Sequence, residues 1–289
     1  MGLRYVGGVR AHQRRVHDVT DHRRSLPDVD HLGAASIVLK IGGSILGEEA
    51  AALDVVAALN DSGHSLVVVH GGGPLATEWS GRLGLETRFI RGLRVTDAAT
   101  RDVALATMAG LANTRIVAAL IARGVPAVGL SGVDGGMLRA EREDAALGLV
   151  GRVTLVDSAL LEELLEAGRV PVVAPAALDK KDGEVLNVNG DGAAGALAAS
   201  LGARLLVFVT DVPGVRSKDG KVIPSLDAAR AKALVDDGTI EGGMVPKVEA
   251  CLIASLAGCR SAIVAARGAD AIERLLSGEQ VGTVFEAAA

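Results

Sequence analysis

Hydrophobic and polar residues alternate along most of this chain in blocks that predict strands and helices in turn. An apolar run over residues 37–41, interrupted only by Lys40, ends at Gly42 and Gly43. An apolar run closed by a glycine turn is typical of a central strand in a parallel sheet. The lysine needs an anionic partner, because burying an unpaired ammonium group costs roughly several kcal/mol.

The same alternation continues to the end of the chain. Strands are expected at 36–41, 66–70, 126–130, 170–174, 185–189, 205–210, 261–265 and 283–285, with 270–276 also assigned to the sheet, and short hairpin strands within 131–155. Helices are expected at 48–60, 74–83, 97–123, 156–166, 190–201, 226–236 and 246–257. Repeated strand–helix units predict an α/β fold, a three-layer αβα sandwich around a central, mostly parallel sheet.

We expect two lobes, an N-lobe over 36–178 and a C-lobe over 179–289, preceded by an extension over 1–35. The extension holds six arginines and four of the six histidines, without a helical apolar stripe. A disordered or loosely attached tail, or an upstream start codon, is the simplest interpretation. An oligomerisation arm or a regulatory segment is the functional alternative.

Composition narrows the classes of protein. Half of the residues are apolar but only five are aromatic, so aliphatic side chains must build the core. The net charge of −5 and the scarcity of aromatic stacking platforms argue against nucleic-acid binding. Cys251 and Cys259 are expected to be buried thiols. No apolar run approaches the roughly 18 residues of a membrane span, and no secretory signal follows Met1, so we expect a cytoplasmic protein.

Two glycine turns are candidate anion sites. His70 ends a strand and is followed by Gly71-Gly-Gly-Pro74, with proline at a helix start. Unpaired backbone N–H groups point outward at a helix N-terminus and attract anions. The turn after Lys40 offers glycine backbone beside a cation. A plain tight turn is the alternative for the segment after His70.

A third glycine-rich segment imitates a dinucleotide site. Gly190-Asp-Gly-Ala-Ala-Gly195 fits G-x-G-x-x-G after a strand, with Asp211 about 20 residues further on. However, a long α/β segment precedes it, Asn187 and Asn189 put amides in the strand, and Asp191 would repel a pyrophosphate. The sequence also lacks the Walker pattern G-x-x-x-x-G-K-[ST].

Six motifs occur in a fixed order: Lys40-Ile-Gly-Gly-Ser44, His70-Gly-Gly-Gly-Pro74, Gly92-Leu-Arg-Val-Thr96, Leu186-Asn-Val-Asn-Gly-Asp191, Thr210-Asp-Val-Pro-Gly214 and Gly242-Gly-Met-Val-Pro-Lys247. Together they resemble the amino-acid kinase family over roughly residues 36–286. Within it they are most similar to the members that phosphorylate N-acetyl-L-glutamate in arginine biosynthesis. Gly190 departs from the family pattern, which usually has alanine before the aspartate.

The resemblance implies that ATP, with Mg2+, phosphorylates the side-chain carboxylate of N-acetyl-L-glutamate to an acyl phosphate. A carboxylate with a free pKa of about 4.3 is already deprotonated at neutral pH, so no general base is needed. Catalysis must instead bring two anions together, which requires positive charge, backbone donors and alignment. The metal is expected to bridge ATP phosphates and waters, so no protein ligand for it is assigned.

The resemblance also implies roles for individual residues. The catalytic set is Lys40, Lys247 and Asp191; the substrate-binding set is Gly72, Gly73, Arg94 and Asn187; the nucleotide-binding set is Gly42, Gly43, Asp211 and Gly214. Structural alternatives exist for the charged residues: a buried ion pair for Lys40, a solvated surface lysine for Lys247, a helix N-cap for Asp191 and a surface arginine for Arg94.

Three questions of function stay open at this point. A sister kinase acting on an N-acetyl- or carrier-linked aminoadipate differs by one methylene in its substrate, which changes selectivity by only about 1–3 kcal/mol. A non-catalytic arginine-binding regulator is disfavoured by the retained lysines and Asp191. Inhibition by arginine is undecided, and we expect a homodimer, with a hexamer of dimers as the alternative.

Overall fold

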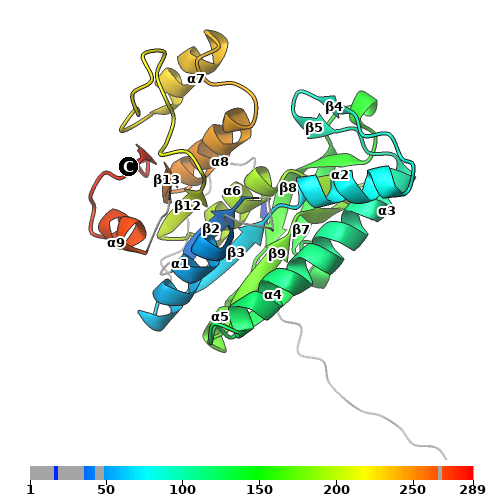
Figure 1. Cartoon of the computed structure of the whole chain (residues 1–289), viewed down its shortest axis with the longest axis horizontal. Coiled ribbons are helices and arrows are strands. Elements are labelled where there is room, and N and C mark those ends of the chain that lie inside the picture. The colour runs from blue at the N-terminus through cyan, green and yellow to red at the C-terminus, as the bar shows by residue number, and fades with distance from the viewer. Residues whose placement is uncertain (1–15, 19–35, 43–48, 266–268, 289) are drawn as a thin grey trace, which may run out of the picture.

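The computed structural model describes residues 16–18, 36–42, 49–265 and 269–288 (Figure 1). The interpretation of the extension as a tail falls mostly outside these residues, and Gly43 lies outside them as well. From the extension, the described residues form strand β1 (Val16–Asp18), which pairs antiparallel with β8.

A seven-stranded sheet forms the centre of the molecule. Its order is β14-β13-β12-β2-β3-β9-β6, and all neighbours are parallel except β13 and β14. The bounds are β2 Ile37–Ile41, β3 Leu66–His70, β6 Ala127–Ser131, β9 Val170–Ala174, β12 Leu205–Val209, β13 Arg260–Val264 and β14 Thr283–Phe285. The predicted mostly parallel sheet is therefore confirmed, with β2 paired on both sides.

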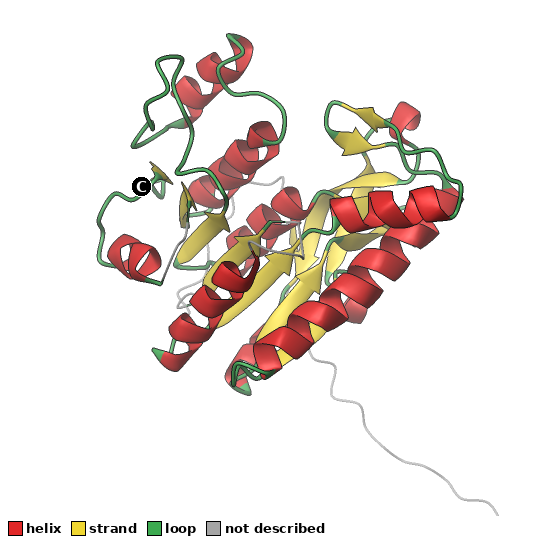
Figure 2. Cartoon of the chain, in the orientation of Figure 1, coloured by secondary structure: helices red, strands yellow, loops and turns green. Residues whose placement is uncertain are grey.

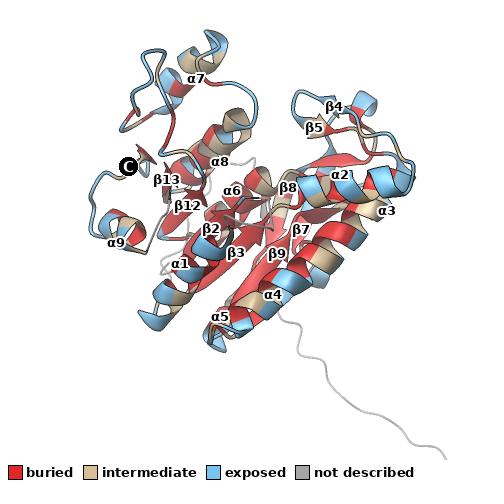
Figure 3. Ribbon diagram, viewed as in Figure 1, coloured by how far each residue is buried: buried red, intermediate tan, exposed pale blue. Residues whose placement is uncertain are grey.

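Helices cover both faces of this sheet and complete the predicted three-layer sandwich (Figure 2). One face packs against α1 (Glu49–Asp61), α4 (Asn113–Ile121) and α9 (Asp270–Leu276). The other packs against α5 (Ala159–Glu166), α6 (Gly190–Leu201) and α8 (Met244–Leu256). Burial is concentrated in the strands and in the sides of the helices that face them (Figure 3).

Side-chain alternation along β2 decides where Lys40 points. Ile37, Leu39 and Ile41 belong to the core under α1, whereas Val38 belongs to the core under α6. Successive strand residues face opposite sides of a sheet, so Lys40 shares the side of Val38. The lysine therefore faces α6 and α8.

The assignment of residues 270–276 to the sheet is wrong, because this segment is helix α9. Its buried residues Ile272 and Leu275 are three positions apart, which places them on one face of a helix. A strand would instead have buried alternate residues. The run of apolar residues is too short to distinguish the two-residue period of a strand from the 3.6-residue period of a helix.

A second sheet, of five strands, joins residues from both predicted lobes. Its order is β1-β8-β11-β10-β7, with β7 Leu138–Arg142, β8 Val150–Asp157, β10 Ala176–Asp179 and β11 Val185–Val188. The expected short strands within 131–155 are β7 and the longer β8. The predicted lobe boundary at 178/179 falls inside β10, and the division into two lobes stays a prediction.

A small hairpin and two further helices lie beside the two sheets. Strands β4 (Phe89–Ile90) and β5 (Leu93–Arg94) form the hairpin near α2 (Gly73–Arg82), and α7 (Ala228–Asp236) packs on α8 (Figure 1). An antiparallel bridge between Arg216 and Val222 encloses the turn at Gly220.

The predicted long helix after Asp97 consists of α3 (Ala98–Leu105), a π-helical segment (Ala106–Ala112) and α4. Asp97 caps it by accepting a hydrogen bond from Thr100 N at 2.8 Å. At 24 residues, it is long and apolar enough to cross a membrane by length and composition, which corrects the expectation that no segment qualifies. Core helices pass the same test, and this one buries Ile116 and Leu120 against the sheet.

Candidate active site

Lys40, Asp191 and Lys247 meet at the carboxyl end of β2. Lys40 Nζ lies 2.8 Å from Asp191 Oδ1, and Lys247 Nζ lies 2.8 Å from Oδ2 of the same carboxylate. Asp191 lies in the first turn of α6 and Lys247 in the first turn of α8. Three residues far apart in the sequence, predicted as one catalytic set, therefore form one cluster.

Two of the structural alternatives are excluded by this geometry. The N-cap of α6 is Asn189, whose side chain accepts hydrogen bonds from the backbone N–H of Asp191 and Gly192, so Asp191 is not the cap. The side chain of Lys247 is only 24% exposed and is ion-paired, so it is not a solvated surface lysine. Lys40 is buried in an ion pair. This pairing is compatible both with a catalytic lysine and with a purely structural ion pair.

The cluster carries an unbalanced charge. Among the residues that the structure describes, two ammonium groups face one carboxylate, which leaves one net positive charge. Burial by itself raises the pKa of Asp191, but the charges of Lys40 and Lys247 outweigh it and hold that pKa below its usual range. The N-termini of α6 and α8 add positive partial charge at the same place. An anion such as a phosphoryl group would complete the site.

Close contact between α6 and α8 sets the position of Lys247. A Cβ atom on Gly195 would lie 2.8 Å from the carbonyl oxygen of Ala250, so only glycine permits this approach. Ala250 is three residues beyond Lys247, and Gly195 is four residues beyond Asp191. The backbone contact therefore fixes the two helix starts that carry the ion pair. Sequence reasoning missed Gly195 in this role.

Gly190, where the chain departs from the family pattern, lies against Lys40. A Cβ atom at this position would be 3.1 Å from Lys40 Cε and 3.1 Å from His70 O. An alanine would fit only if these atoms shifted by a few tenths of an ångström. The glycine therefore gives the Lys40 side chain additional room.

His70 contacts the backbone of the glycine turn between β3 and α2. The ring lies with Nδ1 2.6 Å from Gly71 O and Nε2 3.0 Å from Asn113 Nδ2. A carbonyl oxygen only accepts, so Nδ1 carries the proton and Nε2 accepts from the amide. Burial lowers the pKa of His70 to about 4, a hydrogen bond to Gly71 opposes this, and the charge of Lys40 adds to it. The ring is therefore neutral at pH 7.

The π-helical segment reaches the same turn. Gly72 has a φ of +153°, and a Cβ atom there would lie 2.7 Å from Met108 Cγ. Asn113 follows the π-helical segment and also donates to Val172 O at 2.8 Å. Met108 therefore leaves no room for a side chain at residue 72. Gly73 begins α2, and a Cβ atom there would have no neighbour within 4 Å. Neither Met108 nor Asn113 was indicated by a sequence motif.

Arg94 is buried, and its hydrogen bonds go to a backbone carbonyl and to hydroxyl groups. Its Nη2 donates to Gly73 O at 2.9 Å and to Thr77 Oγ1 at 2.8 Å, and its guanidinium stacks over Phe89 at 5.0 Å from the ring centroid. Within the described part of the chain, no carboxylate forms an ion pair with it. Burial lowers the pKa of Arg94 from its ordinary value. A surface arginine is thereby excluded, and a buried guanidinium of this kind is suited to a ligand carboxylate.

Asn187 lies close to Arg94 through Thr96. Asn187 Nδ2 is 3.2 Å from Thr96 Oγ1, and Thr96 Oγ1 donates to Arg94 O at 2.7 Å. The two predicted substrate-binding side chains are therefore linked by a single hydroxyl group. The sequence placed Thr96 in a motif and offered it, beside Asp97, as a candidate helix cap, but gave it no role in binding; Asp97 is the cap.

The predicted nucleotide-binding residues follow two neighbouring strands. β2 and β12 are parallel, with Ile41 opposite Val209, so exposed Gly42 and exposed Asp211 lie beyond the same edge of the sheet. Ligands of open α/β sheets bind beyond this edge. Gly214, with a φ of +148°, is buried, and a Cβ atom there would lie 2.7 Å from Thr283 Oγ1. Packing alone therefore accounts for this glycine.

A parallel sheet whose strands end in glycine turns and unbalanced basic side chains is the arrangement of an α/β phosphotransferase. The model of the Amino acid kinase family matches residues 35–266, and the chain belongs to this family.

Individual relatives agree with this assignment. The acetylglutamate kinase of Dehalococcoides mccartyi (strain ATCC BAA-2266 / KCTC 15142 / 195) is 41% identical over 254 residues, covering 86% of this chain and 93% of its own. That of Cereibacter sphaeroides (strain ATCC 17029 / ATH 2.4.9) is 42% identical over 244 residues, covering 83% of each chain.

Among solved structures, smu.665 from Streptococcus mutans UA159 aligns with a TM-score of 0.74 at 27% identity, covering 88% of this chain and all of its own. A carbamate kinase from Giardia lamblia bound to AMP-PNP aligns with a TM-score of 0.63 at 16% identity, covering 88% of this chain and all of its own, and shares the fold. These likenesses confirm the predicted fold class.

Proposed function

We propose that this chain uses ATP to phosphorylate the side-chain carboxylate of N-acetyl-L-glutamate, the second step of arginine biosynthesis. The observation that carries the proposal is the buried Lys40–Asp191–Lys247 cluster with its excess positive charge. Relatives named acetylglutamate kinase, 41% and 42% identical to this chain, support the choice of acid. As a biosynthetic kinase it would work in the cytoplasm.

The lysines supply the electrostatic part of the reaction. The substrate carboxylate attacks without a base, and Lys40 and Lys247 reduce the repulsion between it and the γ-phosphoryl group. Asp191 holds both ammonium groups in place between turnovers. Backbone N–H groups at Gly72 and Gly73 lie at the N-terminus of α2 and are suited to hydrogen-bond the reacting groups.

We propose that Mg2+ binds here together with the nucleotide. The described residues contain no group of three His, Cys, Asp or Glu side chains that could hold a metal ion. Mg2+ commonly takes its oxygens from phosphates and water with few protein ligands. When bound, it would neutralise charge on the ATP phosphates.

Recognition of the two substrates falls to different parts of the chain. Arg94 binds the α-carboxylate of the acid through its planar guanidinium, and Asn187 hydrogen-bonds the same molecule. Gly42 and Asp211 are assigned to the nucleotide because they are exposed just beyond the ends of strands β2 and β12. Gly43 and Gly214 are assigned to it on the family resemblance alone. A homodimer, with a hexamer as the alternative, and inhibition by arginine complete the proposal.

A coupled assay of ADP release tests the function. N-acetyl-L-glutamate, N-acetylaminoadipate and glutamate are compared as acceptors, each with and without arginine. We expect kcat/KM to be highest for N-acetyl-L-glutamate. Equal or greater kcat/KM for N-acetylaminoadipate would reject the assigned substrate in favour of a lysine-pathway kinase, and no turnover of any acid would favour a non-catalytic role.

A further inference from the structure

We propose that Thr96 is a positioning residue for the acidic substrate, because its hydroxyl group couples the backbone of Arg94 to the side-chain amide of Asn187. The inference rests on the proposed function, in which those two residues bind the same acid. Thr96 itself is fully buried and would not touch the substrate. Its effect would pass through its two hydrogen-bond partners.

The hydroxyl group determines which way the Asn187 amide points. Thr96 Oγ1 has one hydrogen, which it donates to Arg94 O at 2.7 Å. It can therefore only accept from Asn187, 3.2 Å away, and the atom facing it must be the amide nitrogen. This arrangement leaves the amide oxygen and the second N–H of Asn187 with a fixed orientation toward a ligand.

The main chain of Thr96 is held independently of its hydroxyl group. Thr96 N donates to Leu147 O at 2.9 Å, and Leu149 N donates to Thr96 O at 2.7 Å. Asn187 N in turn donates to Leu149 O at 3.0 Å, so β11 stays beside the same segment. Removing the hydroxyl group should therefore release the Asn187 amide without displacing the backbone.

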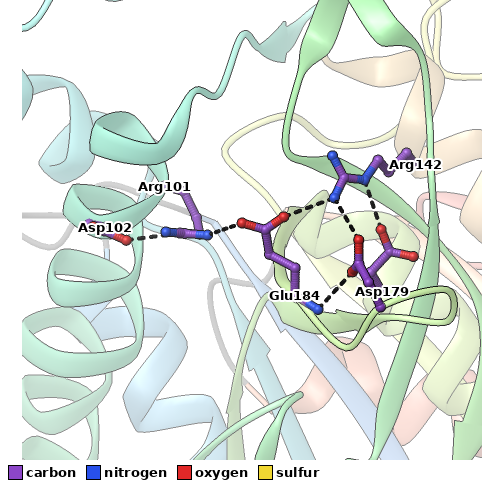
Figure 4. Close-up of polar contacts among 6 residues, drawn as sticks. Arg101, Asp102, Arg142, Asp179 and Glu184 are labelled. Carbon is purple, nitrogen blue, oxygen red and sulfur yellow. Dashed lines mark hydrogen bonds and ion pairs between the residues drawn. The ribbon is translucent and has the colours of Figure 1, made fainter.

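A second set of contacts secures the other end of β11. Glu184, which precedes the strand, lies 2.9 Å from Arg101 on α3 and 2.8 Å from Arg142 on β7 (Figure 4). Arg101 follows Thr96 by five residues, so the segment 184–188 contacts the segment 96–101 at two places, through Asn187 with Thr96 and through Glu184 with Arg101. Glu184 and backbone hydrogen bonds thus hold β11 in place. The hydroxyl group of Thr96 has only to orient the side chain of Asn187.

The test compares Thr96→Val, which removes the hydroxyl group but keeps the shape, with Thr96→Ser, which keeps the hydroxyl group. For Thr96→Val we expect a roughly tenfold rise in KM for N-acetyl-L-glutamate, the equivalent of one lost hydrogen bond, with KM for ATP within about twofold. Thr96→Ser should remain within about threefold of the parent chain. In an Asn187→Ala background, Thr96→Val should add little, because the group it orients is gone.

A spectroscopic measurement keeps the inference testable whatever the acid is. The chain has four asparagines, so selective 15N-asparagine labelling gives four side-chain amide pairs, and Asn187→Ala assigns one of them. The Asn187 pair should exchange slowly with water in the parent chain and Thr96→Ser, and at least tenfold faster in Thr96→Val.

The outcomes separate the two proposals. No turnover of N-acetyl-L-glutamate by the parent chain overturns the function, while unchanged Asn187 amide exchange in Thr96→Val overturns the inference. Equal rises in KM for ATP and for the acid, or a Thr96→Ser variant as impaired as Thr96→Val, would also overturn it, because they indicate a general structural defect.

Discussion

Two groups of charged side chains in this chain have opposite charge balances. In the buried cluster at the end of β2, Lys40 and Lys247 share one carboxylate. Around Arg101 and Arg142, two guanidinium groups face four carboxylates. Those of Asp102, Asp179 and Glu184 are labelled in Figure 4, and the fourth is that of Asp182. The buried group has too few anions, whereas the peripheral group has a surplus of them.

The two groups of charged side chains also differ in how deeply they are buried. The side chains of Lys40 and Asp191 are 7% and 8% exposed, whereas those of the pair Arg142 and Glu184 are 41% and 40% exposed. Asp179, in the same network, is 4% exposed, so the comparison is with the Arg142–Glu184 pair. Water and salt screen an exposed pair and reduce its contribution to stability to about 0–1 kcal/mol. A buried excess charge is screened much less and remains available to a ligand. In this chain, charge balance and burial therefore differ together between the proposed reaction site and the Arg101–Arg142 network.

Loss of a buried cation should have the largest effect. Lys40→Ala should lower kcat by roughly 100-fold to 1,000-fold or more, since one donor to a developing charge contributes about this much. Lys180→Ala is the matched control, because Lys180 pairs with Glu141 on the surface. Coupled ADP release measures both, and near-parental turnover by Lys40→Ala would remove this lysine from the mechanism.

Neutralising the buried anion should cost stability. Asp191→Asn leaves two ammonium groups without a counter-charge, and we expect the free energy of unfolding to fall by about 3–5 kcal/mol. Urea denaturation followed by circular dichroism measures the change. A loss below about 1 kcal/mol, the range of an exposed pair, would show that the two lysines do not depend on this carboxylate.

The neutral ring of His70 predicts a pH dependence. Its pKa falls from 6.5 in the unfolded chain to about 4 in the folded chain, so the unfolded chain binds more protons between these values. Stability should therefore fall as pH falls from 6.5 to 4, by about 3 kcal/mol in total, and be unaffected by this group above about pH 7.

Urea denaturation across pH 4.5–8, on the parent chain and on His70→Gln, checks this dependence. The glutamine variant should lose most of the slope. Identical slopes in the two proteins would assign the acid sensitivity to other groups.

Arg94→Lys tests a buried cation outside the cluster. The ammonium group cannot reproduce the planar fork that reaches Gly73 O and Thr77 Oγ1, so substrate binding should weaken. We expect KM for the acid to rise by roughly tenfold, with KM for ATP nearly constant. The reverse pattern, with ATP affected more, would place Arg94 on the nucleotide side.

The smallest effect is expected in the peripheral network. Glu184→Gln removes one charge shared by Arg101 and Arg142, and the free energy of unfolding should change by less than about 1 kcal/mol. Raising the salt concentration should make the variant and the parent more alike. A loss as large as that of Asp191→Asn would erase the distinction between the two groups.

Much of the architecture could be predicted from the sequence because the strands are buried on both faces. The run over residues 205–209, for example, consists of five buried apolar residues, a pattern typical of a central strand. The prediction of a strand at 270–276 was wrong, because a short apolar pattern does not distinguish a strand from a short helix. The second sheet was not predicted as one sheet, because its strands come from separate parts of the chain.

The site was predictable where chemistry is unusual for its surroundings. A lysine inside an apolar strand and an aspartate in a glycine-rich segment both required partners, and they pair with each other. Thr96, Asn113 and Gly195 gave no such signal. Their roles depend on which side of a packed element they face, and a threonine, an asparagine or a glycine is ordinary in a loop or helix.

The π-helical segment Ala106–Ala112 has a consequence for how this chain can change in length. Its wide turn places Met108 against Gly72 and brings Asn113 to His70. Deleting one residue, for example exposed Gly110, would restore an ordinary turn and rotate α4 by about 100° around the helix axis. Relatives with a one-residue gap here should therefore also differ at His70 or Gly72, so that the number of residues in this helix evolves together with the turn it supports.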